Sequence, residues 1–443
     1  MKKRIILAII DGLGDETIPE LNGTPLEYIS DRLANMNKLA EEGLCGLMYP
    51  ISPGIPPSSD TAHLTIFGYD LSKEYTGRGY FEALGAGIPI EEGDVAIRFN
   101  FATVKKQNNH LVVVDRRAGR TAGEEFSLLA KDLQEAINER GLPVEIHHTL
   151  EHRGVMIIKG TTKKLSRMVS DTDPHEVGVP VLSATPLEET PPDELEHAKR
   201  TAEIINEVVK LSYRIFDNHE VNIKREERGL LKANIILTRG AGIAIRMTPF
   251  SDKWGLRAAY IAAGPLYKGV ARAVGMEEIT VKGATGTVKT NINAKIEGTI
   301  KAFDSGYDFV FLHIKATDNL SHDKKPREKA EFILKIDHAL EKLLDLDDIV
   351  IAITGDHSTS SLKGRHIGLP LPIVFWSDSG IRKDGARKFN ERECIKKGGL
   401  GVLFGKDIMP LLLDLANRLM EYGIRTSPKQ VLYTGAYGEP LKI

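Results

Sequence analysis

Short apolar runs, each followed by a loop, recur along the chain, first at the N-terminus and repeatedly after about residue 230. They are Arg4–Ile10, Asn234–Leu237, Ala258–Ala262, Asp308–His313, Asp348–Ile353 and Ile373–Trp376. Between them, apolar residues at helical spacing predict helices, most clearly at Glu328–Leu344. Buried strands that alternate with helices are typical of a mostly parallel sheet covered by helices on both faces. The pattern therefore predicts an α/β fold.

Local signals place the ends of other helices. Thr24, Pro25 and Glu27 form a capping-box pattern that predicts a helix start, and the helical spacing that follows is expected to end at Gly43. A loop rich in Pro, Gly and Ser at residues 50–60 predicts a further helix from about Thr61.

The middle of the chain has a different pattern. Residues 77–93 hold five glycines, which indicates turns and a change of domain. Short strand-like runs and two amphipathic helices follow, at Val95–Phe99, Leu111–Val114, Val155–Ile158, Glu124–Arg140 and Asp193–Phe216. We therefore expect a discontinuous core of residues 1–78 and 252–443, interrupted by an inserted α+β cap domain at residues 79–251.

Length, charge and cysteine content narrow the function classes. The chain has 443 residues, which favours two or three domains, and its net charge of −2 is too small for nucleic-acid binding by phosphate neutralisation. The longest apolar run has six residues, whereas a membrane helix needs roughly 20. Cys45 and Cys394 are interpreted as free thiols of a reducing compartment. We expect a cytoplasmic protein acting on a small molecule, with no nucleic-acid or membrane partner and with homo-oligomer formation left open.

Carboxylates and imidazoles stand next to the ends of the apolar runs. They are Asp11, Asp318, His322, Asp356, His357 and His366. In open α/β sheets ligands bind at the carboxyl ends of the strands, so these residues can converge although they span over 300 positions. Oxygen and nitrogen donors without thiolate suit Mn²⁺, Zn²⁺, Co²⁺ or Fe²⁺ better than Ca²⁺. Six such ligands, with one more linked to the substrate, predict a two-metal site.

Ser59 is the candidate nucleophile. It lies in a Pro/Gly loop directly before a predicted helix, where the helix dipole favours a phosphate group. A serine hydroxyl does not ionise unaided, so a metal ion would have to activate it. Ser58 competes for this role, and helix capping by Ser59 or Asp60 is the structural alternative.

The motifs together resemble the alkaline phosphatase superfamily and, more narrowly, the archaeal-type branch of cofactor-independent phosphoglycerate mutase. The resemblance rests on the ligand residues above and on Pro57–Leu64 (PSSDTAHL), Asp115–Arg120 (DRRAGR), Thr238–Gly242 (TRGAG), Tyr267-Lys268 and Gly283–Gly286 (GATG). It runs along nearly the whole chain. It implies an alkaline-phosphatase-like core with a mostly parallel sheet flanked by helices, plus the cap.

The resemblance also implies a role for individual residues. Ser59 would carry the phosphoryl group as phosphoserine, with Lys268 close to the transferring phosphate. Two divalent ions (Mn, Zn or Co, with Mg also allowed) would be bound by two sets of ligands. The first set is Asp11, Ser59, Asp356 and His357, and the second is Asp318, His322 and His366. Substrate contacts would come from His63, Arg117, Arg120, Arg153 and Arg239, with Asp173 and His175 as further cap contributors.

The activity that the resemblance implies is interconversion of 3-phosphoglycerate and 2-phosphoglycerate in glycolysis and gluconeogenesis, independent of 2,3-bisphosphoglycerate. The main alternative is a metal-dependent phosphatase or phosphodiesterase of the same superfamily, which would release phosphate. A lyase acting on phosphonopyruvate and a non-catalytic binding protein are further alternatives.

Three segments have no role in this interpretation. Residues 246–255 and the charged stretch 380–397 look irregular, and the second could be an oligomer contact or a mobile loop. His147, His148 and His152 form a local cluster, but neighbouring strand residues point to opposite faces, so the first two do not easily share a metal.

Overall fold

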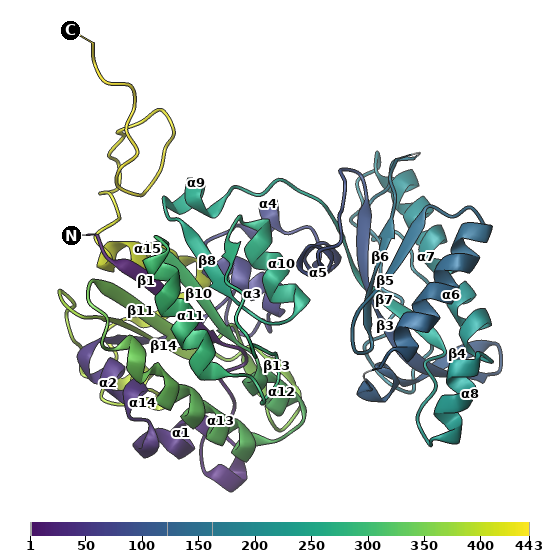
Figure 1. Ribbon diagram of the computed structural model, residues 1–443, viewed down its shortest axis with the longest axis horizontal. Coiled ribbons are helices and arrows are strands. Elements are labelled where there is room, and N and C mark those ends of the chain that lie inside the picture. The colour runs from purple at the N-terminus through teal and green to yellow at the C-terminus, as the bar shows by residue number, and fades with distance from the viewer. Residues whose placement is uncertain (1, 122, 162, 443) are drawn as a thin grey trace. The chain divides into compact units, whose positions relative to one another are not determined.

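The computed structural model describes residues 2–121, 123–161 and 163–442 (Figure 1). They form two compact units: unit 1 is residues 1–75 with 247–443, and unit 2 is residues 76–246. Unit 2 is therefore one continuous segment inserted into the sequence of unit 1. In the described parts of the chain, no helix is both long enough and apolar enough to cross a membrane.

Unit 1 is built on a sheet that has eight strands among the described residues. Its order is β15 (Gly401–Phe404), β2 (Leu44–Tyr49), β14 (Leu371–Ser377), β11 (Ile349–Thr354), β1 (Arg4–Ile10), β10 (Phe309–Ile314), β8 (Ala258–Ile261) and β9 (Glu277–Glu278). Strand β14 runs antiparallel to both of its neighbours, and the remaining pairs are parallel. The central strands are buried on both faces, as continuous apolar runs require. The expected mostly parallel α/β sheet is confirmed.

Helices cover both faces of this sheet (Figure 1). One apolar core joins the sheet to α1 (Pro25–Ile29), α2 (Asn35–Glu42), α11 (Ile292–Asp304) and α13 (Pro326–Ala339). On the other face lie α3 (Ser59–Ile66) and α10 (Pro265–Ala273), where the rings of His63 and Phe67 pack on Phe311 of β10. The remaining elements of unit 1 are α4 (Leu71–Glu74), α9 (Phe250–Trp254), α12 (Ala316–His322), β12 (Ser358–Ser360), β13 (Arg365–Ile367), α14 (Glu391–Lys397) and α15 (Ile408–Leu415).

The capping box at Thr24 is confirmed. Thr24 Oγ1 accepts a hydrogen bond from the Glu27 N–H at 3.1 Å, and Glu27 Oε2 accepts one from the Thr24 N–H at 3.2 Å. The single helix expected from Thr24 to Gly43 is wrong, because α1 ends at Ile29 and α2 begins at Asn35. The break is stabilised from outside the segment: the Asp337 carboxylate of α13 accepts from three consecutive backbone N–H groups at the start of α2.

Unit 2 is an antiparallel sheet with helices, which confirms the expected α+β character of the inserted segment. The sheet contains β4 (His110–Asp115), β3 (Val95–Gln107), β6 (Arg153–Ile158) and β5 (Val144–Leu150), with β7 (Ile235–Ile243) also paired to β3. Its helices are α5 (Arg78–Ala86), α6 (Glu125–Glu139), α7 (Leu195–Phe216) and α8 (Glu220–Glu227). The apolar run at 234–237 therefore belongs to this sheet and not to the parallel one.

A buried ion pair joins helix α13 to the loop after β1 in unit 1. Lys329 Nζ on α13 lies 2.9 Å from Asp15 Oδ2, and both side chains are fully buried. Asp15 also accepts hydrogen bonds from the backbone and hydroxyl of Ser361, between β12 and β13. Because Asp15 follows β1, its bonds to Lys329 and Ser361 hold the loop after β1 against α13 and the β12–β13 hairpin.

We expect Lys329→Met to lower the free energy of unfolding by about 3–5 kcal/mol, because the Asp15 carboxylate would stay buried without its cation. Urea or thermal unfolding of the purified variant measures the change. Lys335→Met is the matched control: this lysine is exposed on the same helix, and its replacement should stay within about 0.5 kcal/mol of wild type. Equal losses in the two variants would contradict the prediction.

Candidate metal centre

The candidate ligands come from the carboxyl ends of three adjacent strands. Asp11 directly follows β1, Asp318 and His322 lie on α12 after β10, and Asp356 follows β11 by two residues. The strands lie in the order β11-β1-β10, with Ile9 level with both His313 and Thr354. Parallel strands end at one edge of a sheet, so side chains more than 300 residues apart in sequence meet there.

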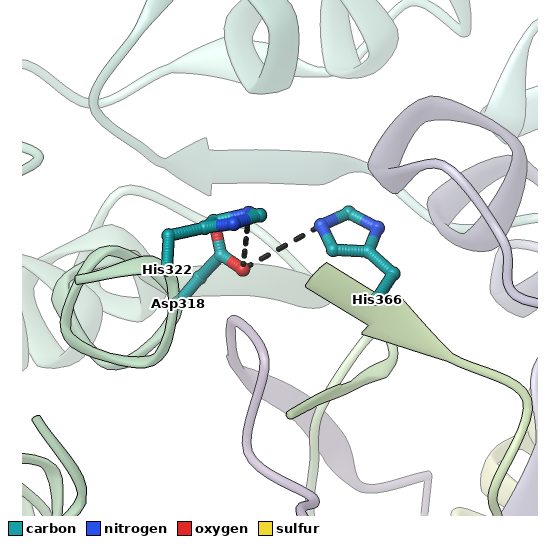
Figure 2. A group of neighbouring side chains, drawn as sticks. All are labelled: Asp318, His322 and His366. Atoms are coloured by element: carbon teal, nitrogen blue, oxygen red, sulfur yellow. Dashed lines mark ion pairs between the residues drawn. The ribbon is translucent and has the colours of Figure 1, made fainter. Parts of the chain in front are cut away.

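The first group of ligands is Asp318, His322 and His366 (Figure 2). Asp318 Oδ1 lies 3.4 Å from His322 Nε2 and 3.6 Å from His366 Nε2. His366 comes from β13, opposite Thr359 in the β12–β13 hairpin. One ligand atom of each residue lies within 4.8 Å of the others, a spacing that fits one shared cation.

The second group is Asp11, Asp318 and His357, whose ligand atoms also lie within 4.8 Å of one another. His357 Nε2 is 3.6 Å from Asp11 Oδ1 and 3.2 Å from Asp356 Oδ2. All four side chains are buried. Asp318 belongs to both groups, so the two candidate cation positions share one carboxylate.

The three imidazoles each make a hydrogen bond through Nδ1, so that Nε2 is the nitrogen directed to the ligand group. The Nδ1 atom faces an acceptor 2.6 to 2.9 Å away in every case: the Gly364 carbonyl for His322, the Pro57 carbonyl for His366 and Thr359 Oγ1 for His357. A ring that donates through Nδ1 keeps its Nε2 lone pair for a metal. Asp11 Oδ1 and Asp356 Oδ2 are buried without a hydrogen-bond partner among the described residues. The donor set therefore fits divalent cations.

Burial favours the uncharged form of three of these groups, His322, Asp356 and His357. It lowers the pKa of His357 well below the usual value, and the neighbouring His366 lowers it further. Burial also lowers the pKa of His322. Both rings are therefore neutral at neutral pH, as metal ligands must be. Burial and the charge of Asp11 raise the pKa of Asp356 well above its ordinary value, which a bound cation would reverse.

Ser59 is the first residue of α3, which begins earlier than the sequence pattern predicts. Its Oγ lies 3.3 Å from His357 Nε2 and its side chain is buried. Ser58 is the N-cap residue, and its hydroxyl lies 3.0 Å from Thr61 Oγ1 instead. The structure thus brings Ser59, and not Ser58, next to a candidate metal ligand at a helix N-terminus, where backbone N–H groups favour an anion.

His63 lies one turn further along α3. Its Nδ1 is 2.6 Å from the Ser59 carbonyl and 3.6 Å from Asp356 Oδ2. The ring is buried and packs edge-on against Tyr267 and His313. These contacts place His63 beneath the Ser59 turn as a packing neighbour, while its predicted contact with substrate stays a prediction.

Two lysines near the site differ in their partners. Lys315 Nζ lies 3.1 Å from Asp11 Oδ2 and 3.0 Å from Asp318 Oδ2. Although burial lowers its pKa, these two carboxylates raise it well above the usual value. Lys268, which the resemblance assigns to the phosphate, instead forms an ion pair with Glu278 at 2.5 Å. Sequence reasoning missed Lys315, although its position three residues before Asp318 at a strand end was a usable signal.

The predicted substrate arginines all lie in unit 2. Arg153 on β6 and Arg239 on β7 flank β3, while Arg117 and Arg120 follow β4. Between the flanking pair lies Arg98 of β3, a buried arginine that sequence reasoning missed. Burial, together with the charge of neighbouring arginines, lowers the pKa of Arg117 and of Arg239 to about 10.

Arg98, Arg153 and Arg239 form an arginine cluster on three neighbouring strands, and part of their hydrogen-bonding capacity is unused among the described residues. Glu82 Oε1 accepts from Arg78 at 3.1 Å and lies 3.2 Å from Arg98 Nη1. The Nε atoms of Arg98, Arg153 and Arg239 are buried with no hydrogen-bond partner among the described residues. Clustered guanidinium groups with unused N–H donors predict a site that binds an oxyanion.

Asp173 and His175, the other predicted contributors from unit 2, both contact Arg116. Asp173 accepts both hydrogen bonds of an Arg116 fork, at 2.6 and 2.7 Å, and Arg116 Nη2 lies 3.1 Å from His175 Nδ1. His152 is buried beside the arginines, with both ring nitrogens unpaired within the described part of the chain. Burial, and then the charge of Arg153, lower the pKa of His152 to about 2, so it is neutral.

The α/β core gathers carboxylates, imidazoles and a helix-start serine at its strand ends, an arrangement suited to metal-dependent phosphoryl transfer. Residues 40–222 match the family model of 2,3-bisphosphoglycerate-independent phosphoglycerate mutase. Similar proteins of that name come from Pyrococcus horikoshii (44% identical over 96% of this chain and 99% of that one) and Metallosphaera sedula (45%, over 96% and 100%). The chain belongs to the 2,3-bisphosphoglycerate-independent phosphoglycerate mutase family.

Solved structures agree with this family. A Pyrococcus horikoshii protein aligns with a TM-score of 0.77 at 38% identity, covering 96% of this chain and 100% of that one. A cofactor-independent phosphoglycerate mutase from Thermoplasma acidophilum aligns with a TM-score of 0.61 at 35% identity, covering 94% and 100%. The resemblance stated from the sequence motifs is therefore confirmed at the level of the family.

Proposed function

We propose that this protein interconverts 3-phosphoglycerate and 2-phosphoglycerate through a phosphoserine at Ser59, without 2,3-bisphosphoglycerate. The observation that carries the proposal is the position of Ser59, whose Oγ lies 3.3 Å from His357 Nε2 within the ligand cluster. Family membership supports the same activity. The substrate is accordingly a small molecule; a cytoplasmic location and homo-oligomer formation stay predictions.

Two divalent cations are proposed at the two ligand groups. Asp318, His322 and His366 would hold one, and Asp11, Ser59, Asp356 and His357 the other, with the Asp318 carboxylate within reach of both. Bound there, the cations would lower the pKa of the serine hydroxyl and neutralise phosphate charge. We propose Mn²⁺, Zn²⁺ or Co²⁺, with Mg²⁺ also allowed, because the donors are carboxylates and imidazoles without thiolate.

The chain's own residues then perform the transfer. Ser59 Oγ forms a bond to phosphorus while the bond from phosphorus to the 3-oxygen of the substrate breaks, leaving glycerate and phosphoserine. The 2-hydroxyl of the retained glycerate next attacks the same phosphorus and regenerates Ser59. The N-terminus of α3 supports the phosphoryl charge throughout, since its backbone N–H groups are unpaired within the helix.

Retention of glycerate separates a mutase from a phosphatase. We propose that unit 2 acts as the substrate-binding cap, and that Arg117, Arg120, Arg153 and Arg239 bind the carboxylate and phosphate groups. Guanidinium forks pair with both oxyanions, and a bound glycerate can turn without leaving. Water must be excluded during this step, because water would hydrolyse the phosphoserine.

A coupled assay tests this proposal directly. With 3-phosphoglycerate as substrate and no added 2,3-bisphosphoglycerate, enolase should convert the product to phosphoenolpyruvate, while a parallel assay detects little free phosphate. Added 2,3-bisphosphoglycerate should not change the rate. Stoichiometric release of phosphate would support the phosphatase alternative and contradict the mutase proposal.

A further inference from the structure

The Lys315 ammonium lies between carboxylates that belong to the candidate metal ligands. Its Nζ is 3.1 Å from Asp11 Oδ2 and 3.0 Å from Asp318 Oδ2, and it lies 5.1 Å from the centre of the Tyr267 ring. The Lys315 side chain is 15% exposed, although it lies among buried groups. Lys315 directly follows β10 and precedes α12, both well-packed elements.

Divalent cations and this ammonium need the same carboxylates. Asp318 belongs to both candidate ligand groups and Asp11 to one of them. Like charges that share the same carboxylates in a partly buried site repel each other, so cation binding would weaken the attachment of Lys315 to both carboxylates. An ammonium released in this way has three donors and needs an anionic acceptor.

Lys268, the lysine that the resemblance assigns to the phosphate, already has a charged partner. Lys268 Nζ lies 2.5 Å from Glu278 Oε1, and Glu278 also accepts from Arg272 and from the Tyr260 hydroxyl. Lys268 is thus part of a network on α10 and the β8–β9 edge. Its charge is compensated there independently of the metal ligands.

We propose that Lys315, and not Lys268, is the catalytic lysine that contacts the phosphoryl group transferred to and from Ser59, and that it competes with the cations for Asp11 and Asp318 before substrate binds. This inference rests on the proposed phosphoserine mechanism and names a further residue for it. The Lys315 ammonium stabilises the charge that develops on the phosphoryl oxygens. The proposal predicts opposite effects of one substitution on metal binding and on catalysis.

The test compares Lys315→Met, Lys268→Met and the exposed-lysine control Lys335→Met. Three quantities are measured: Mn²⁺ affinity of the substrate-free protein by calorimetry, inorganic phosphate affinity at saturating Mn²⁺, and kcat in the coupled assay. For Lys315→Met we expect Mn²⁺ to bind about tenfold more tightly, because a competing cation is gone. Phosphate affinity should fall about tenfold and kcat about 10²-fold or more, because a positive group at the phosphoryl oxygens is lost.

Two outcomes would overturn the proposal. One is a loss of Mn²⁺ affinity in Lys315→Met together with activity that returns at high Mn²⁺, which is the behaviour of a lysine that only holds the ligands in place. The other is the same loss of phosphate affinity in Lys268→Met. Lys315→Gln provides a second neutral variant if the methionine variant does not fold. Phosphate affinity is read without turnover, so the result stands apart from the mutase assay, whose failure would contradict the proposed function.

Discussion

Ser59→Ala lowers the mutase rate by about 10³-fold or more and prevents any covalent phosphoenzyme from forming. The expected loss is large because the variant has no hydroxyl to accept the phosphoryl group, and a nucleophile that is removed is not replaced by its neighbours. The fold should be retained, since within the described part of the chain Ser59 Oγ makes a single hydrogen-bond contact, with His357 at 3.3 Å, and caps no helix. The coupled enolase assay measures the rate, and intact-mass analysis after rapid quenching detects the phosphoserine.

Ser58→Ala is the matched control for this substitution. Ser58 is the preceding residue and the N-cap of α3, and its hydroxyl contacts Thr61 and lies outside the ligand cluster. Its loss should leave the phosphoenzyme detectable and the rate within a few-fold of wild type. Retention of a tenth of the activity by Ser59→Ala would mean that another group is the nucleophile.

Asp318→Asn has the second largest expected effect, because Asp318 is the carboxylate common to both ligand groups. The substitution replaces one carboxylate oxygen by an amide nitrogen and so removes a negative charge that both cation positions share. We expect the affinity for Mn²⁺ to fall about 10²-fold or more at both positions, and the mutase activity to fall with it. Calorimetry reports both the affinity and the number of ions bound per chain.

A comparison with His322→Ala makes this prediction specific. His322 belongs to one group only, so its replacement should weaken one ion and leave the other. Asp304→Asn, an exposed aspartate near the end of α11, should bind Mn²⁺ as wild type does. Unchanged stoichiometry and affinity in Asp318→Asn would rule out a shared ligand at this position.

Much of the core could be predicted from local patterns. The apolar runs that became β1, β10 and β11 are continuous, which indicated strands buried on both faces. Because the carboxyl ends of parallel strands meet at one edge, the sequence alone predicts that the polar residues after each run lie close together. The capping box at Thr24 was equally readable, since both of its hydrogen bonds lie within four residues.

Other features depended on distant parts of the chain. The helix expected from Thr24 to Gly43 is interrupted because Asp337, some 300 positions away, accepts the N–H groups that start α2. The run at 234–237 pairs with β3, and its own sequence did not distinguish the two sheets. The assignment of Lys268 rested on a Tyr-Lys motif alone. The structure shows that Lys268 pairs with Glu278, whereas Lys315 pairs with Asp11 and Asp318.

The amino-acid sequence alone determined the α/β class, the family and the chemical types at the strand ends, because hydrophobic periodicity, capping and motif spacing are local properties of the chain. Only the tertiary structure decided which side chains share a charge environment: that Ser59 and not Ser58 approaches His357, that Asp318 serves two groups, and that Lys315 lies between the carboxylates. Electrostatic interactions and hydrogen bonds act over a few ångströms in space, and separation along the sequence does not report that distance.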